Sequence, residues 1–244
     1  MLRPRAIIPL LLAAIMTAGA HAEDMHAAQR TAMVDTIARI TRDTALESGR
    51  AELGARVLAA MNKVPRHRFV PADEEPYAYS NRPLPIGHGQ TISQPFIVAL
   101  MTDLLDLKPG DRVLEIGTGC GYQAAVLAEL AREVYTIEIV APLAEEAAAR
   151  FVALGYRNVT SRSGDGYGGW PEHAPFDAII VTAAAPAVPP ALVAQLKPGG
   201  KLVIPVGAQW SGQELLVIEK DLQGKTTTRN ALAVRFVPLT RDKE

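Results

Sequence analysis

A glycine-dense turn between a short apolar run and a helical stretch is the feature that most constrains the fold of this chain. The apolar run covers residues 113–116, glycines occupy every second position of the turn, and an alanine- and leucine-rich stretch follows at 122–130. A strand, a glycine loop and a helix in this order are typical of the first βαβ unit of nucleotide-binding folds. Because glycine lacks a Cβ and tolerates positive φ, a ligand can lie directly against the backbone where the helix begins.

The spacing of Gly117, Gly119 and Gly121 indicates which ligand. A dinucleotide-binding loop needs its third glycine three residues after the second, but Tyr122 occupies that position and Gly121 comes one residue early. The pattern E-x-G-x-G-x-G is instead typical of loops that bind S-adenosylmethionine (SAM), which has a sulfonium cation and an amino-acid tail but no phosphates. Glu115 is then placed to hold the ammonium group of that tail.

Strands and helices alternate regularly after residue 110. We expect strands at 112–116, 134–137, near 159, 176–181, 201–205, 214–219 and 231–237, and helices at 122–130, 142–154 and 190–196. This alternation predicts an α/β, Rossmann-like doubly wound fold of the SAM-dependent methyltransferase type, with a mostly parallel sheet and a C-terminal antiparallel hairpin. Ligands of such sheets bind at the carboxyl ends of the strands.

Three acidic residues fall at those strand ends. Glu115 ends the first strand, Glu138 ends the second, and Asp165 follows the third, directly before Gly166. An acid about 20 residues beyond the glycine loop is placed to accept hydrogen bonds from ribose hydroxyls, which is the role we predict for Glu138. Asp165 is predicted to accept from the adenine amino group.

The N-terminal part has a different character. Helical spacing is visible over 25–49, with Met33, Ile37, Ile40 and Leu46 on one face, and again over 51–61. We expect one methyltransferase domain over 23–244, divided into an N-terminal helical cap at 23–80 and a Rossmann-like core at 81–244. With 244 residues, 48% of them hydrophobic, the chain can bury one sizeable core.

Residues 1–22 are predicted to be a signal peptide. Arg3 and Arg5 precede an apolar run at 6–16, and the small-residue site Ala20-His21-Ala22 follows. The alternative is an uncleaved anchor, although the run is shorter than the ~20 residues of a membrane span. We therefore expect a periplasmic or secreted protein with no stable membrane association after cleavage, the alternative being a cytoplasmic one.

Composition excludes two classes of function. The formal net charge is −1, and removal of the first 22 residues, with two arginines and no acid, leaves 23 basic and 26 acidic residues. This balance argues against a nucleic-acid partner held by phosphate contacts. Five histidines and a single cysteine form no metal-ligand cluster in the sequence, so no metal is expected.

The segment 81–105 contains a candidate catalytic residue. Its first half is rich in proline and glycine, and the helix that follows carries an apolar face. Ser93 lies where the two halves meet, so it is a candidate N-cap of this helix, with Pro95 in the first turn, and a candidate active-site residue, and the two roles are compatible. His88 is expected to be structural, and His67 is expected to be a solvated loop histidine.

The loop after the fourth core strand limits which class of molecule can accept the methyl group. Enzymes that methylate the amino groups of bases carry a polar-Pro-Pro-aromatic tetrapeptide there, whereas this chain has Thr182-Ala183-Ala184-Ala185-Pro186. Nothing in this loop can stack on a base. Its small side chains leave room for a bulkier ligand such as a peptide backbone.

Several motifs together resemble one family, the protein-L-isoaspartate O-methyltransferases. These motifs, in chain order, are PRHRFVP, LPIGHGQTISQP, VLEIGTGCGYQAA, GDG, APFDAIIVTAAAP, LKPGGKLVIPVG and RFVPL. The resemblance covers roughly residues 50–240 and implies methyl transfer from SAM to the α-carboxylate of isoaspartyl residues in damaged proteins and peptides. The methyl ester then closes to a succinimide, which partly reopens to aspartate.

The resemblance also implies roles for individual residues. Ser93 matches the family's active-site serine, and with Thr91 it would bind the acceptor carboxylate. Arg235 is a further candidate for that carboxylate, the alternative being a salt bridge at a strand edge. The cofactor residues of the family fall on Glu115, Gly117, Gly119, Gly121, Glu138, Asp165 and Gly166.

Two features depart from the family pattern. Cys120 lies at a loop position where serine is common, and the signal peptide is unusual because SAM is a cytoplasmic metabolite. Two alternatives therefore stay open. The first is an exported methyltransferase of a small carboxylate, and the second is a non-catalytic binder that keeps the fold. A monomer is expected.

Overall fold

A seven-stranded sheet organises the structure, a computed structural model that describes residues 9–208 and 212–241, with side chains from residue 26 onward. The strands of this sheet are β3 (Arg112–Ile116), β4 (Glu133–Glu138), β5 (Val159–Ser163), β6 (Phe176–Val181), β7 (Leu196–Val206), β8 (Gln213–Lys220) and β9 (Thr226–Val234). Their order is β5-β4-β3-β6-β7-β8-β9, parallel from β5 to β7 and antiparallel from β7 to β9. The predicted fold class is confirmed.

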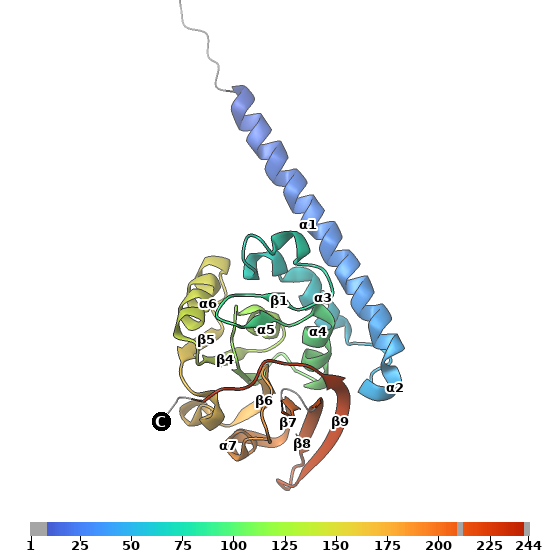
Figure 1. Ribbon diagram of the computed structural model, residues 1–244, viewed down its shortest axis with the longest axis vertical. Coiled ribbons are helices and arrows are strands. Elements are labelled where there is room, and N and C mark those ends of the chain that lie inside the picture. The colour runs from blue at the N-terminus through green and yellow to red at the C-terminus, as the bar shows by residue number, and fades with distance from the viewer. Residues whose placement is uncertain (1–8, 209–211, 242–244) are drawn as a thin grey trace, which may run out of the picture.

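Helices cover both faces of the sheet (Figure 1). They are α1 (Pro9–Asp43), α2 (Ala45–Ser48), α3 (Ala55–Lys63), α4 (Pro95–Leu104), α5 (Tyr122–Ala128), α6 (Ala141–Leu154) and α7 (Pro190–Gln195). Short 3-10 turns are η1 (Arg66–Phe69), η2 (Glu75–Tyr77), η3 (Gly166–Gly168) and η4 (Pro171–His173). A small hairpin pairs β1 (Leu84–Pro85) with β2 (Thr91–Ile92). It replaces the irregular segment that the sequence predicts.

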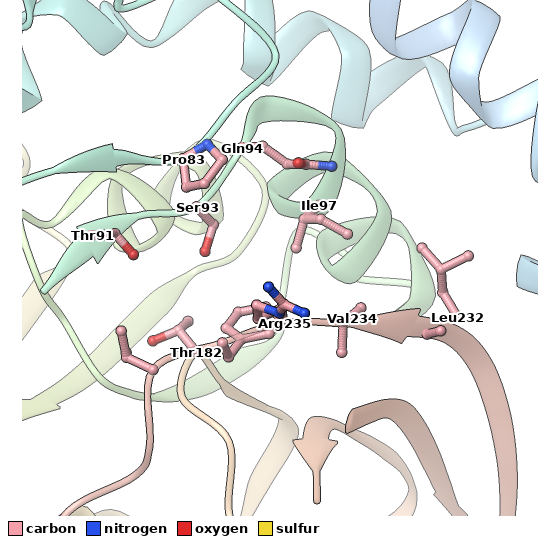
Figure 2. Close-up of a pocket in the computed structure, with 12 residues that line it drawn as sticks. Pro83, Thr91, Ser93, Gln94, Ile97, Thr182, Leu232, Val234 and Arg235 are labelled. Atoms are coloured by element: carbon pink, nitrogen blue, oxygen red, sulfur yellow. The ribbon is translucent and has the colours of Figure 1, made fainter. Parts of the chain in front are cut away.

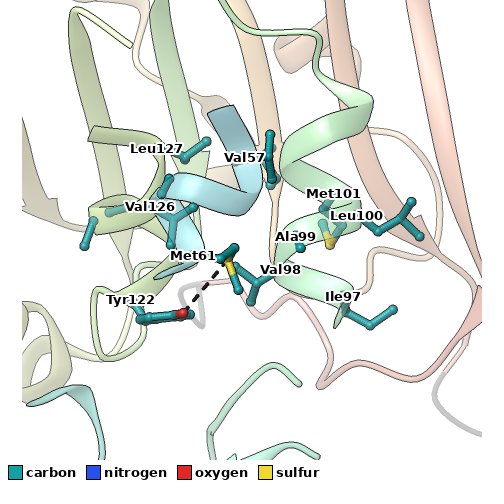
Figure 3. Close-up of a cluster of buried hydrophobic side chains, with 14 of the residues drawn as sticks. Val57, Met61, Ile97, Val98, Ala99, Leu100, Met101, Tyr122, Val126 and Leu127 are labelled. Atoms are coloured by element: carbon teal, nitrogen blue, oxygen red, sulfur yellow. Dashed lines mark hydrogen bonds between the residues drawn. The ribbon is translucent and has the colours of Figure 1, made fainter. Parts of the chain in front are cut away.

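Alternation along the strands divides the core into two layers. On β3, Val113 packs with the helices α1, α3, α4, α5 and α6, whereas Leu114 and Ile116 pack on the opposite face with α7. The first layer is continuous from the N-terminal helices to the sheet, and Figure 3 shows where α3, α4 and α5 meet in it. The N-terminal helices are therefore part of the main hydrophobic core.

The N-terminal helices differ from the prediction in their bounds. One helix, α1, runs without a break across residue 22, and its first turns extend away from the sheet (Figure 1). Arg3 and Arg5 lie outside the described residues. Met33 and Ile37 are buried as predicted, but Leu46 is fully exposed because the helix ends at Asp43 and the short α2 follows at a different angle. Helix α3 begins at Ala55, after Gly54, and not at residue 51.

The C-terminal hairpin is longer than predicted and ends earlier. Strand β9 begins at Thr226 and stops at Val234, so Arg235 follows the strand and does not belong to it. Beyond β9 the chain crosses back over the sheet, since Ala184 N donates to Val237 O at 2.8 Å and Leu239 N donates to Ala184 O at 2.8 Å. These two bonds bring residues 235–240 to the carboxyl ends of the parallel strands.

The apolar face predicted over residues 25–49 yields a testable difference between Ile37, which lies on α1, and Leu46, which lies on α2. Ile37→Ala should lower the free energy of unfolding by about 2–5 kcal/mol, because it removes a fully buried side chain. Leu46→Ala should change it by less than about 0.5 kcal/mol, since the side chain is exposed. Urea unfolding followed by circular dichroism measures both, and equal losses would contradict the placement of α1.

Candidate active site

The glycine loop begins directly beyond β3. Gly117 N and Thr118 N both donate to Ile137 O, at 2.8 and 3.3 Å, so the loop is fixed against the end of β4. Gly117, Gly119 and Gly121 have φ of 96°, 52° and 91°, a region that side chains disfavour. The loop conformation therefore requires glycine at each position.

The glycines differ in what lies beside their missing Cβ. At Gly121 a Cβ would meet the Phe151 ring at 2.8 Å, and at Gly166 it would meet Ile116, so both are required by packing. Gly117 and Gly119 line a cavity beside Glu138 and Thr182. Contacts of Gly121 and Gly166 with a cofactor stay predictions.

Glu138 is fixed by the loop that it faces. Its Oε2 accepts from Gly119 N at 2.7 Å and its Oε1 accepts from Val140 N at 2.9 Å. Each carboxylate oxygen can accept a second hydrogen bond, and the residue lines the same cavity as Gly117 and Gly119. Its predicted role toward ribose hydroxyls is compatible with this placement.

Glu115 is completely buried at the end of β3. Its Oε2 accepts a hydrogen bond from the Thr136 hydroxyl, while its Oε1 has no partner among the described residues. Burial raises the pKa of this carboxyl group to about 8, despite the Thr136 hydroxyl and with a small contribution from Glu138. An unpaired, buried carboxyl oxygen is what a cationic group would stabilise.

Asp165 caps the η3 turn, where its Oδ1 accepts from Tyr167 N at 2.8 Å. Glu115 thus lies near the end of β3, Glu138 ends β4 and Asp165 follows β5, and these three strands are neighbours in the sheet. The prediction that the three acids lie at one edge is confirmed in geometry. Their contacts with a cofactor stay predictions.

A second, larger cavity of about 470 Å³ lies beside the glycine loop. Ser93 and Thr91 face it from the end of β2, and Thr182 and Arg235 face it from the opposite side (Figure 2). Among the described residues of its wall Arg235 is the only charged one, and it forms no ion pair with any of the others that the structure describes. A wall with hydroxyls, one cation and no carboxylate suits an anionic ligand.

Ser93 is not the N-cap of α4. Gln94 occupies the N-cap position without a capping bond of its own, and Phe96 N donates its hydrogen bond to Asn81 Oδ1 at 2.9 Å. Because a distant side chain caps the helix, the Ser93 hydroxyl is free to face the cavity. The second of the two roles considered for Ser93 is therefore the one compatible with the structure.

Thr182 was missed as a site residue. It lines the large cavity and also both smaller cavities at the glycine loop. Its hydroxyl donates to Gly117 O at 2.6 Å. The position of Thr182 directly after a core strand is visible in the sequence, but no local pattern indicates its hydrogen bond to the glycine loop.

The two histidines outside the cavities have different surroundings. His67 is half-buried, its Nδ1 lies 2.7 Å from Tyr79 Oη, and its ring stacks on His26 at 3.8 Å. Burial, then His26, lowers its pKa to about 4, so the prediction of a solvated loop histidine is wrong. His88 is exposed in the β1–β2 turn with φ of 52°.

Comparison with known proteins now decides the family. The family model described as protein-L-isoaspartate(D-aspartate) O-methyltransferase matches residues 44–244. The chain belongs to this family. Protein-L-isoaspartate O-methyltransferase 1 of Cupriavidus necator is 60% identical over 97% of this chain and 93% of its own length. The Opitutus terrae protein-L-isoaspartate O-methyltransferase is 54% identical over 99% of this chain and 100% of its own length.

Solved structures of the isoaspartate methyltransferase family resemble this chain closely. One protein-L-isoaspartate O-methyltransferase has a TM-score of 0.73 and 29% identity over 84% of this chain and 65% of its own. Another, from Plasmodium falciparum and in complex with S-adenosyl-L-homocysteine, has a TM-score of 0.69 and 25% identity over 85% and 98%.

The residues at the glycine loop fit the cofactor of this methyltransferase family. SAM presents an ammonium group, two ribose hydroxyls and an adenine amino group, all of them hydrogen-bond donors. Among the predicted acceptors, Glu138 lines the cavity that contains Gly117 and Gly119. The unpaired oxygen of Glu115 and the carboxylate of Asp165 follow at the same sheet edge but line none of the three cavities at the site, so their contacts with SAM stay predictions.

Glu115 makes the stability of this methyltransferase depend on pH. The carboxyl group ionises near pH 4.5 in the unfolded chain and near 8 in the folded protein, so the folded state holds an extra proton between these values. The free energy of unfolding should therefore fall by up to about 1.4 kcal/mol per pH unit as pH rises through this window, and level off above about pH 8.

Thermal unfolding of the wild type and of Glu115→Gln between pH 5 and 9 measures this effect. The Tm of the wild type should fall relative to that of the variant up to about pH 8, because glutamine does not titrate. A difference in Tm that stays constant with pH would show that Glu115 is ionised throughout.

Proposed function

We propose that this protein transfers a methyl group from SAM to the α-carboxylate of L-isoaspartyl residues in damaged proteins, which starts their repair to aspartate through a succinimide. The family supports the reaction and the kind of substrate. One observation supports these residue assignments. Thr182 lines both the cavity that contains Ser93, Thr91 and Arg235 and the cavity at the glycine loop. Acceptor and cofactor sites are therefore adjacent.

The groups in the cavity wall match what this chemistry needs. SAM, when bound, supplies a methyl group activated by its sulfonium cation. The acceptor carboxylate, with a pKa near ~4, is already ionised at neutral pH and needs no general base. The part of the wall that the structure describes accordingly contains no Asp, Glu or His. Ser93 and Thr91 can donate hydrogen bonds to the carboxylate, and Arg235 adds positive charge. Positioning of this kind can supply several kcal/mol of barrier reduction.

The alternatives receive no support from the comparisons. A volume of about 470 Å³ lies within the range of ~300–1,000 Å³ found for ligand sites, enough for an isoaspartyl residue and part of its neighbours. A non-catalytic binder would not need the predicted site residues, all of which are present. The division of the chain at residue 80 and the monomeric state remain proposals.

Methyl transfer from labelled SAM to paired peptides, one with isoaspartate and one with aspartate, tests the function. The wild type should methylate only the isoaspartyl peptide. Ser93→Ala should lose about 10–150-fold in kcat/KM, the equivalent of a hydrogen bond to a charged group, while its affinity for S-adenosyl-L-homocysteine stays unchanged. Ser80→Ala, at an exposed position, is the control. A parallel loss of cofactor affinity in Ser93→Ala would contradict the assigned role.

We also propose that the protein is exported, with a cytoplasmic location as the alternative. The support is the arginine pair, the apolar run and the small-residue site within residues 1–22. Among the described residues, no helix combines the length and the apolar character that crossing a membrane requires.

Expression of the full chain in a Gram-negative host tests export. Protein from the periplasmic fraction should begin at Glu23 by intact mass, and Ala22→Leu, which removes the small residue from the cleavage site, should leave the segment attached. Full-length protein confined to the cytoplasmic fraction would contradict export.

A further inference from the structure

Arg66 is a completely buried cation beneath the acceptor site. Its Nε donates to Ala78 O at 2.8 Å and its Nη2 donates to Ser93 O at 2.7 Å. The guanidinium carbon lies 4.8 Å from the centre of the Tyr122 ring. No described carboxylate pairs with it, and its Nη1 has no hydrogen-bond partner among the described residues.

Stability alone does not account for this arginine. Burial of a charge without a counter-ion is costly, and an apolar side chain of similar size usually packs at least as well. Burial lowers the pKa of Arg66, with Tyr122 acting in the opposite direction. An arginine nevertheless stays charged inside proteins. Its burial therefore destabilises the folded state, and a local function would explain why an arginine lies here.

The contacts of Arg66 connect the two halves of the site. Ser93 follows β2 and faces the acceptor cavity, while Tyr122 is the first residue of α5, directly after the glycine loop. Tyr122 is itself fixed in the core, where its hydroxyl lies 3.9 Å from Met61 Sδ (Figure 3). Arg66 is thus anchored on the cofactor side and bonded to the acceptor side.

The hydrogen bond from Arg66 fixes the peptide carbonyl group of Ser93. Ser93 lies between the end of β2 and the start of α4, and Arg66 is the donor to its carbonyl oxygen among the described residues. The orientation of this peptide group sets the direction of the Ser93 side chain, and a displacement of about 1 Å can cost ~100-fold in rate.

We propose that Arg66 is a positioning residue that holds the Ser93 hydroxyl in place relative to the glycine loop. The inference rests on the proposed function of Ser93. Arg66 lines none of the three cavities at the site, so it acts on the acceptor through Ser93.

A double-mutant cycle between Arg66 and Ser93 tests this role. Arg66→Met should lower kcat for the isoaspartyl peptide at least about tenfold. Here kcat is calculated per S-adenosyl-L-homocysteine binding site, so that misfolded protein is not counted as enzyme. In the Ser93→Ala background the same substitution should cost less than about twofold. A purely structural role predicts the same factor in both backgrounds, and that result would overturn the proposal.

Arg150→Met is the matched control. Arg150 is also partly buried and donates to Cys120 O in the glycine loop at 2.6 Å, but it does not contact Ser93. Its effect on kcat should therefore be the same in both backgrounds.

Arg66→Lys replaces Arg66→Met if the latter does not fold. Lysine keeps the charge but cannot bond both carbonyl groups in the same planar geometry, so its loss should again depend on Ser93. Full activity of Arg66→Lys would show that charge alone suffices, which overturns the proposal. If Ser93→Ala retains wild-type activity, the role of Ser93 fails, and the inference about Arg66 fails with it. If the wild type is inactive, the proposed function fails instead.

Discussion

Strand β3 pairs in parallel with β4 on one side and with β6 on the other. Because parallel strands end at the same edge of a sheet, the glycine loop after β3, Glu138 at the end of β4 and Thr182 after β6 converge there. Two hydrogen bonds hold the glycine loop in place there, one from Gly117 N to Ile137 O and one from the Thr182 hydroxyl to Gly117 O. The proposed cofactor site and the proposed acceptor site are both built on it.

Charge separates the two sides of this edge. Glu115, Glu138 and Asp165 lie on the side of β3, β4 and β5, where we propose that the cationic and donor groups of SAM bind. The proposed acceptor cavity has hydroxyl groups and Arg235, and no acid among the described residues of its wall. This division suits an anionic acceptor that must approach a sulfonium cation, because each ligand meets groups of opposite polarity.

Much of the site could be predicted because the sequence patterns that indicate it are formed by neighbouring residues. Positive φ at Gly117 and Gly119 follows from the glycines themselves, and the alternating strands and helices place the acids at one edge. The errors arose where distant contacts decide. Asn81 caps α4 in place of Ser93, and Tyr79 and His26 enclose His67, which is otherwise a typical loop residue. Such partners are distant in the sequence, so no local sequence pattern identifies them.

The sequence by itself determined the fold class, the family and the chemistry of the glycine loop, because strand periodicity and glycine conformation depend on neighbouring residues. Tertiary structure alone decided that Arg235 leaves the sheet and reaches the acceptor cavity, and that Arg66 lies beneath Ser93 without a counter-ion. These features depend on segments far apart in the chain. Their energies come from burial and from hydrogen bonds that exist only once the core has formed.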